Sequence, residues 1–392
     1  MDSITSLRQA FQFHEQTLRQ HPNCDADAAF AAALEGRRRP YPVLRLSPNG
    51  HFPIEPGLLE PEFELPEVAM PPSPEADLAR EVIGLLEPIK LLNPVSSSLG
   101  MPGGVRMLLT SFGLPLDPLD TCGGKVIYNR TASELLAGGM PDPAASGMLP
   151  ELRRRIALIA EHAPPSFAIE LPDMQGPFNL MHAILGDQAM YLPREEPEQW
   201  HALMESFTRF WIQVWDNLVS WVGPRHLGQA RHFVRIAECD VNLVSPDFYR
   251  RFILPYDQMI AAASGGRGLH IHPCSGRHVF RATIEQLPNV AMTEAGLLIE
   301  TKVAAAQISV DEAQSIIGGR PVLLSIGQEL PTQGEFEFIT RDLDRAKLNN
   351  RLIFGYTGMH WRSADRPLIR ELHRRLDAHW RDNVLTSPAP AG

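Results

Sequence analysis

Two residues that commonly bind transition metals, His272 and Cys274, stand close together in one short segment of this 392-residue chain. The segment begins as an apolar, β-prone run at residues 268–271 and ends in a Ser-Gly turn. Because residues two apart on a strand point to the same side, both side chains can aim at one point where the strand ends. Imidazole nitrogen and thiolate sulfur are ligands that zinc accepts readily. The alternative interpretation is a buried strand with a hydrogen-bonded histidine and an inert core cysteine.

Three further apolar segments follow, each ending in polar or glycine residues and separated from the next by a plausible helix. They are residues 289–296 with Glu294, residues 321–329 with Gln328, and residues 351–360 with Tyr356 and His360. Short strands that alternate with helices predict β-α units and a parallel sheet. In a (β/α)8 barrel the chemistry takes place at the C-terminal ends of the strands, which is where these residues stand.

Two earlier segments place acidic and amide groups in the same position. Residues 167–171 lead into Asp173 and Gln175, and residues 234–240 end in Glu238 and Asp240. A carboxylate at a strand end can bind a substrate amine or act as a general base, and the alternative is a solvated or capping carboxylate. We therefore take Asp240, Asp173 and Glu238 as catalytic candidates. The substrate-binding candidates are Gln175, Tyr356, Gln328 and Arg277, the last because it opens a predicted helix, whose N-terminus favours anions.

The composition sets limits on the class of protein. Hydrophobic residues make up 44% and charged residues 21% of the chain, which is ordinary for a globular protein. A net charge of −10 disfavours a nucleic-acid-binding surface. Four scattered cysteines do not make a disulfide framework. There is no secretory leader and no apolar run long enough to span a bilayer, so we expect a cytoplasmic enzyme with neither nucleic acid nor a membrane as its partner.

The predicted fold class is α/β, a single (β/α)8 TIM barrel preceded by an N-terminal helical segment and a Pro-rich arm. Residues 1–77 hold the amphipathic helix, expected over residues 2–20, and the arm at residues 48–75, which carries apolar anchors. Such an arm can lie over the body or over a neighbouring subunit, so a homodimer is a candidate assembly. The barrel is expected over residues 78–385. A long helix is expected to carry aromatic residues that we interpret as core packing, namely Trp200, Phe207, Phe210, Trp211 and Trp215.

Several motifs together resemble the uroporphyrinogen decarboxylase superfamily. They are residues 173–177 (DMQGP), 195–201 (EEPEQWH), 244–249 (VSPDFY), 252–256 (FILPY) and 272–276 (HPCSG). That superfamily includes zinc-dependent methyltransferases that act on methylcobamides, and the barrel of cobalamin-independent methionine synthase is similar to it. The resemblance covers roughly residues 80–380 and agrees with the barrel expected from the strand pattern.

The resemblance implies a zinc site formed by His272, Cys274 and Glu294, with one departure from the family pattern. The cysteine that the zinc-dependent members carry on the last strand has no counterpart, and His360 is the nearest competent ligand. One thiolate, one carboxylate and two neutral imidazoles would leave zinc with no net charge. Such a metal is a better Lewis acid, which favours an oxygen or nitrogen substrate over a thiol, and a metal other than zinc is also open.

The leading function is therefore a metal (zinc)-dependent methyltransferase acting on a small molecule in the mouth of the barrel. The resemblance also implies a corrinoid, supplied by a partner protein, as a candidate methyl donor. A decarboxylase or lyase of the uroporphyrinogen decarboxylase type is the enzymatic alternative, although the arginine-rich start of those enzymes has no match in the first part of this chain. A non-catalytic barrel that binds a corrinoid or another ligand is the third possibility.

We predict about one zinc ion per chain, because the ligand types and their strand-end positions suit this metal. Cys274→Ser should lose the metal and keep the fold, since packed layers of side chains stabilise a barrel and one ligand at its mouth contributes little. Elemental analysis and circular dichroism of both proteins, purified without chelator, test this. A folded chain without metal, or a Cys274→Ser variant that unfolds, would favour the buried-cysteine alternative.

Overall fold

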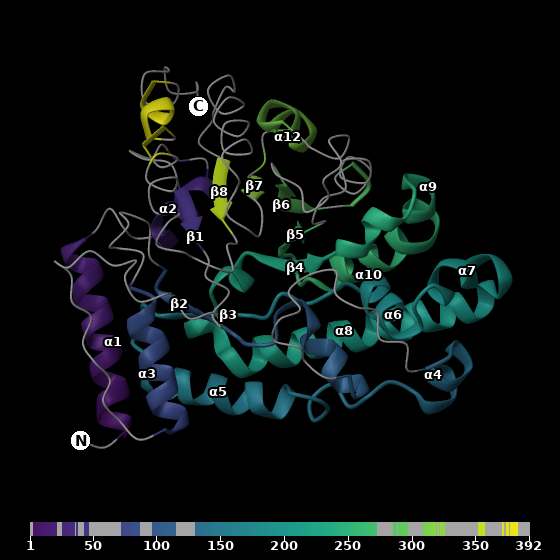
Figure 1. Cartoon of the computed structure of the whole chain (residues 1–392), viewed down its shortest axis with the longest axis horizontal. Coiled ribbons are helices and arrows are strands. Elements are labelled where there is room, and N and C mark those ends of the chain that lie inside the picture. The colour runs from purple at the N-terminus through teal and green to yellow at the C-terminus, as the bar shows by residue number, and fades with distance from the viewer. Residues whose placement is uncertain are drawn as a thin grey trace. The chain divides into compact units, whose positions relative to one another are not determined.

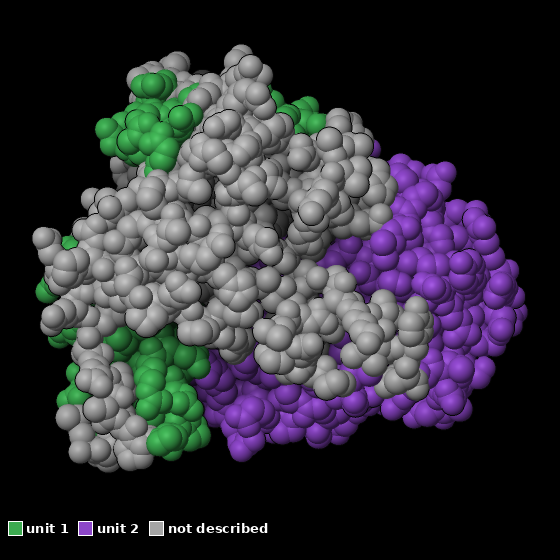
Figure 2. Space-filling model, viewed as in Figure 1, with its two compact units in different colours: residues 1–99, 162–167, 294–392 green, residues 100–161, 168–293 purple. Residues whose placement is uncertain are grey.

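The computed structural model of the chain describes residues 3–21, 26–35, 37, 43–46, 72–86, 96–114, 130–272, 285–287, 289–296, 309–318, 320, 322–325, 352–356, 371, 374–375 and 377–382. These residues fall into two compact units, which Figure 2 colours separately. Unit 1 comprises residues 1–99, 162–167 and 294–392, and unit 2 comprises residues 100–161 and 168–293. Each unit is described by itself.

Unit 1 contains a parallel arrangement of three strands. Its elements are α1 (Ser3–Gln20), α2 (Ala26–Leu34), β1 (Val43–Leu46), α3 (Pro74–Gly84), α12 (Val310–Ile317), β7 (Val322–Ser325) and β8 (Leu352–Tyr356). β8 pairs in parallel with β1 and with β7, so that Phe354 lies opposite both Leu44 and Leu324. The strands predicted within residues 321–329 and 351–360 are confirmed. β1 was not predicted, and it falls within residues 1–77, where we expected only a helix and an arm.

The predicted N-terminal helix is confirmed as α1, which lies alongside α3 (Figure 1). Its apolar face buries Leu7 and Phe11, and the ring of Phe11 meets Phe167 edge-on with 4.9 Å between ring centroids. α3 begins where the Ser73 hydroxyl accepts a hydrogen bond from the Ala76 N–H, an N-cap that satisfies one of the free donors of the first turn. The same α1 face buries His14, and this burial lowers the pKa of its imidazole to about 4.

Unit 2 is mostly helical around a short parallel sheet. Its elements are β2 (Ser98–Gly100, on the unit boundary), η3 (Gly104–Phe112), α4 (Ala132–Gly138), α5 (Leu149–His162), β3 (Ala168–Glu170), α6 (Pro177–Leu185), α7 (Gln188–Glu195), α8 (Pro197–His226), η4 (Gln229–Arg231), β4 (Phe233–Ala237), η5 (Cys239–Leu243), α9 (Pro246–Phe248), the π-helical turn η6 (Tyr249–Ile253), α10 (Leu254–Ala263), β5 (Gly268–His272) and β6 (Val290–Gly296), which runs across the boundary.

Parallel pairing aligns the C-terminal ends of the strands in unit 2. β4 and β5 pair without a shift, from Phe233 opposite Gly268 to Ala237 opposite His272. β6 continues the sheet beyond β5, and an isolated parallel bridge joins Gln175 to Ala237 on the other side. The strands predicted at residues 167–171, 234–240, 268–271 and 289–296 are thus confirmed as β3, β4, β5 and β6. The closed (β/α)8 barrel into which we expected them to assemble stays a prediction.

The aromatic residues of α8 form part of the core of unit 2, as predicted. Trp200, Phe207 and Trp211 are completely buried, and Trp211 stacks on Trp215 with an angle of 7° between the rings. Each such ring removes a large apolar surface from water, so this helix dominates the packing of the unit. Among the residues that the structure describes, no helix is both long and apolar enough to cross a bilayer.

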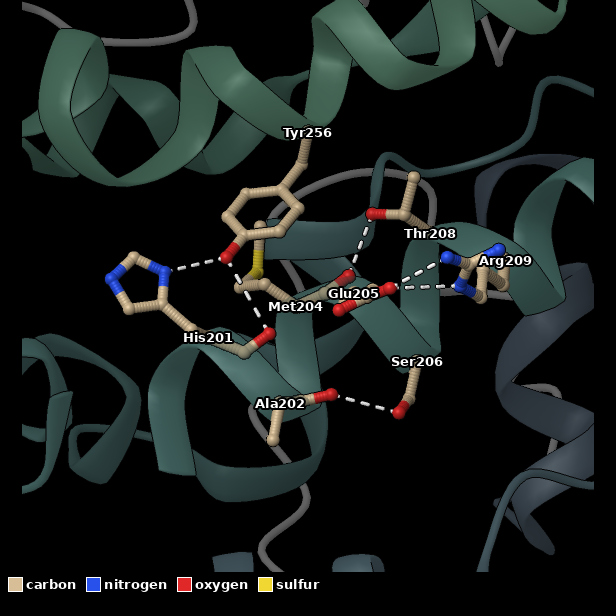
Figure 3. A network of polar contacts seen from close by, with 8 residues as sticks. All are labelled: His201, Ala202, Met204, Glu205, Ser206, Thr208, Arg209 and Tyr256. Atoms are coloured by element: carbon tan, nitrogen blue, oxygen red, sulfur yellow. Dashed lines mark hydrogen bonds and ion pairs between the residues drawn. The ribbon is translucent and has the colours of Figure 1, made fainter. Parts of the chain in front are cut away.

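A polar contact joins α8 to α10 at the edge of this core (Figure 3). The Tyr256 hydroxyl lies 2.7 Å from His201 Nδ1 and donates to the His201 carbonyl oxygen at 3.4 Å. Burial, with a smaller contribution from the charge of Glu205, raises the pKa of the Tyr256 hydroxyl to about 12, so this phenol keeps its proton. One turn further along α8, Glu205 forms an ion pair with Arg209.

We expect Tyr256→Phe to lower the free energy of unfolding by about 1 kcal/mol, because the variant loses hydrogen bonds of a buried hydroxyl but keeps the ring. Urea denaturation measures the change. The matched control is Tyr191→Phe, since Tyr191 is 59% exposed and its hydroxyl stays in water in both states. Equal stabilities of the two variants would show that the contact between α8 and α10 contributes nothing.

Candidate functional site

Polar residues converge at the aligned strand ends of unit 2. The bridge between Gln175 and Ala237, and the pairing of Ala237 with His272, bring the segments after β3, β4 and β5 side by side. The Glu238 N–H donates to the His272 carbonyl oxygen at 2.7 Å, which extends this alignment by one residue. The neighbourhood that we expected for Asp173, Gln175, Glu238, Asp240 and His272 therefore exists in the structure.

Arg235 connects two of these strand ends. Its Nη2 atom lies 3.0 Å from Asp173 Oδ2 and 3.1 Å from His272 Nδ1. Both members of this ion pair are partly accessible to solvent: the Arg235 side chain is 30% exposed and the Asp173 side chain is 19% exposed. A guanidinium group only donates hydrogen bonds, so Nδ1 of His272 must be the acceptor. In this arrangement a neutral His272 ring carries its proton on Nε2.

This hydrogen bond competes with a metal for His272. A neutral imidazole has one lone pair, and in this arrangement Nδ1 uses it to accept from Arg235, so a metal on this ring requires that Arg235 release it. Of the other predicted ligands, Cys274 and His360 lie outside the described residues, and Glu294 is placed in β6 without a described side chain. Within the described part of the chain, no group of three histidine, cysteine or acidic residues is arranged to hold a metal. The zinc site stays a prediction.

Two carboxyl groups are completely buried beside this cluster, Glu238 and Asp257. The Tyr249 hydroxyl donates to Asp257 Oδ2 at 2.9 Å. Within the described structure, Asp257 Oδ1 and both Glu238 oxygens find no hydrogen-bond donor. Two ionised carboxylates have only acceptors to offer each other, whereas a single proton lets one of them donate to the other.

The electrostatics agree with a proton held by this pair. Burial raises the pKa of Glu238 well above its usual range, and the charges of Asp257 and Asp240 add to that effect. Burial also raises the pKa of Asp257, to about 7, against the opposing hydrogen bonds from Tyr249 and Glu238. Near neutral pH the pair therefore keeps a proton that solvent-exposed carboxyl groups would release.

Gly176 makes room for the Glu238 carboxyl group. A Cβ atom at this position would stand 1.5 Å from Glu238 Oε1, so any other residue would displace the carboxyl group. Gly176 is also the N-cap of α6, and its N–H donates to the Ala237 carbonyl oxygen at 2.8 Å. The sequence DMQGP thus has a structural reason for its glycine, which brings the backbone of one strand end against the side chain of the next.

The four residues predicted to bind substrate lie in different parts of the chain. Gln175 is 8% exposed, and its Oε1 atom has no hydrogen-bond partner in the described structure. Tyr356 is the last residue of β8 in unit 1, and its side chain is not described. Gln328 and Arg277 lie outside the described residues. Their predicted roles in substrate binding stay predictions.

Sequence reasoning missed several residues of the cluster, although signals for them were present. Arg235 is a charged residue inside the apolar strand FVRIA, and Asp257 is a lone acid on the apolar helix LPYDQMIAAA. His182 and Asn179 stand three residues apart on the apolar helix PFNLMHAIL, and His182 Nδ1 lies 2.7 Å from Asp240 Oδ2. Polar residues that interrupt a buried face need partners, and here they find them at the strand ends.

The carboxyl pair predicts a stability that falls as the pH rises. Both groups have pKa values in the folded chain that are raised above their usual 4.5 and 3.8, so the unfolded chain releases its protons at lower pH than the folded chain does. The contribution of Asp257 is complete below about pH 4 and is lost as the pH rises through about 7, while Glu238 adds a loss in the same direction. One pKa unit corresponds to about 1.4 kcal/mol, so the loss is on the order of 4 kcal/mol.

Urea denaturation between pH 5 and pH 8 measures this loss. Glu238→Gln leaves Asp257 with an amide donor, so we expect the variant to lose at least about half of the pH dependence. Asp247→Asn, at a side chain that is 88% exposed, is the matched control and should keep the pH dependence of the unaltered chain. A Glu238→Gln variant with an unchanged dependence on pH would show that the pair holds no proton.

Comparison with known proteins adds information on the fold. No protein-family model and no curated protein sequence matches the chain. Among solved structures, the chain is similar to one described as a methyltransferase from Methanosarcina mazei. The alignment has a TM-score of 0.60 and 15% sequence identity, and it covers 91% of this chain and 99% of that one. The chain therefore shares the fold of a methanogen methyltransferase over nearly its whole length.

Proposed function

We propose that the chain is an enzyme of the methyltransferase type that acts on a small molecule at the strand ends of unit 2. The observation that carries this proposal is the position of Arg235, which joins Asp173 to His272 across neighbouring strand ends. Buried or half-buried charged groups are costly unless they are paired, and here paired charges gather at one end of a parallel sheet, where a substrate can reach them. The similarity of fold to a methyltransferase supports methyl transfer as the reaction.

The described groups offer distinct chemistry to a substrate. The Arg235 guanidinium group donates hydrogen bonds, which suits an oxygen or carboxylate group of the substrate. Glu238 holds a proton, and Asp240 offers a carboxylate that can accept one. A methyl acceptor that reacts through a thiol, hydroxyl or amine must lose a proton, so a carboxylate at this position suits the transfer.

The predictions drawn from the sequence remain part of this proposal. A (β/α)8 barrel agrees with the parallel pairing inside each unit. Zinc would supply a Lewis acid toward an oxygen or nitrogen substrate, and it requires a state in which Arg235 has released His272. A corrinoid carried by a partner protein is the proposed methyl donor.

One observation favours a second function, a decarboxylase or lyase. Loss of carbon dioxide leaves a carbanion that must be protonated, and the buried carboxyl pair of Glu238 and Asp257 holds a proton beside the strand ends. Arg235 would then bind a substrate carboxylate, because a guanidinium group matches that group with two parallel hydrogen bonds.

Methyl transfer can be tested with methylcobalamin as the donor and ethanethiol, ethylamine or ethanol as the acceptor. We expect loss of the donor's methyl group, followed by its absorption spectrum and by mass spectrometry of the acceptor, with and without added zinc. Arg235→Met should slow the transfer by about 100-fold, since it removes a charged donor from the site.

Arg250→Met is the matched control, because that side chain is 42% exposed and pairs only with exposed Asp247 among the described contacts, so its rate should be unchanged. Absence of transfer to all three acceptors, or an Arg235→Met variant with the full rate, would contradict the proposal. Release of carbon dioxide from uroporphyrinogen by the same protein would support the decarboxylase instead.

A further inference from the structure

Asp240 is held at two points by side chains from one helix, α6. Its N–H donates to Asn179 Oδ1 at 3.2 Å, and its Oδ2 atom lies 2.7 Å from His182 Nδ1. Asn179 and His182 are three residues apart, so they occupy the same face of α6. Both the backbone and the carboxylate of Asp240 are therefore fixed from the same side.

Asn179 ties this arrangement to the sheet. Its side chain is completely buried, and its Nδ2 donates to the Ala237 carbonyl oxygen at 2.9 Å while its Oδ1 accepts from Asp240. The amide thus spans the turn at the end of β4. Because the two bonds use opposite ends of one rigid amide, the distance between the strand end and Asp240 is set by the Asn179 side chain.

The partners decide where the proton of His182 lies. A carboxylate only accepts hydrogen bonds, so Nδ1 of His182 must carry hydrogen. The ring is oriented by Phe178, which stacks on it at an angle of 11° with 6.0 Å between centroids. The Asp240 side chain is 19% exposed and that of His182 only 7%, so the carboxylate is the more accessible member of the pair.

We propose that Asp240 is the carboxylate that receives the proton of the methyl acceptor, and that His182 and Asn179 are positioning residues that fix it in place. Oδ2 is taken by His182, so Oδ1 is the atom left for the substrate. This inference rests on the proposed methyl transfer. It assigns to the acceptor a group that donates a hydrogen bond, such as a thiol, a hydroxyl or an ammonium group.

In the proposed step the acceptor's bond to hydrogen breaks and the proton goes to Asp240 Oδ1. The lone pair of the acceptor atom forms the new bond to the methyl carbon. The bond between that carbon and its donor, a methylcorrinoid, breaks with its electron pair remaining on the donor. His182 keeps its own proton throughout and stabilises the carboxylate until it is protonated.

The test compares His182→Phe, which keeps a ring of similar shape without a donor, with His182→Asn, which restores an N–H near the position of Nδ1. With methylcobalamin and the best of the three acceptors, we expect kcat/KM to fall about 10- to 100-fold in His182→Phe, the range typical of lost supporting hydrogen bonds. His182→Asn should recover most of the rate. His232→Phe, at an exposed histidine, is the matched control and should be unaffected.

Nitrogen-15 NMR of histidine-labelled protein supplies a readout that does not depend on turnover. The resonance that disappears in His182→Phe should show its proton on Nδ1, and a proton on Nε2 instead would overturn the arrangement. Unimpaired transfer by His182→Phe would overturn the role of Asp240. If the unaltered chain transfers no methyl group, the proposed function fails and the assigned proton transfer fails with it, whereas the NMR result still decides how Asp240 is held.

Discussion

The parallel pairing of β4 with β5 is the constraint on which the candidate site depends. This register places Ala237 opposite His272, and the bridge from Gln175 to Ala237 adds the segment after β3. Side chains that are far apart in the sequence consequently emerge at one edge of the sheet. A shift of one residue between these strands would turn His272 and Arg235 to opposite faces, because the side-chain period of a strand is two residues.

Charge balance then decides which groups can be held there. Asp173 and Arg235 neutralise each other, and Glu238 with Asp257 retains a proton that lowers the charge of the buried pair. His182 donates a hydrogen bond to the Asp240 carboxylate. The low dielectric of the site favours groups whose charge is paired or neutralised by a proton. The site therefore combines three chemical groups: a hydrogen-bond donor at Arg235, a protonated acid in the buried pair and a carboxylate at Asp240. An enzyme that moves protons during a group transfer needs this variety at one place.

The strands and the positions of the acidic residues could be predicted from the sequence because both follow local patterns. Short apolar runs marked β3 to β8, and the residues directly after them marked the strand ends. The hydrogen bond from Arg235 to His272 could not be predicted, since it depends on the register of two strands 30 or more residues apart in the chain. Asp257 and His182 were missed for the same reason, because their partners come from other elements. β1 was missed because proline-rich surroundings obscured a four-residue strand.

If a methyl acceptor binds at the strand ends of unit 2, a crystal structure of the chain with the acceptor identified in the transfer assay will show it there. We expect electron density for the acceptor within hydrogen-bond distance of Asp240 Oδ1, with Arg235 or His272 donating to a second polar group of the same molecule. Density for the acceptor at any other part of the chain, with the strand ends of unit 2 occupied only by water, would contradict it.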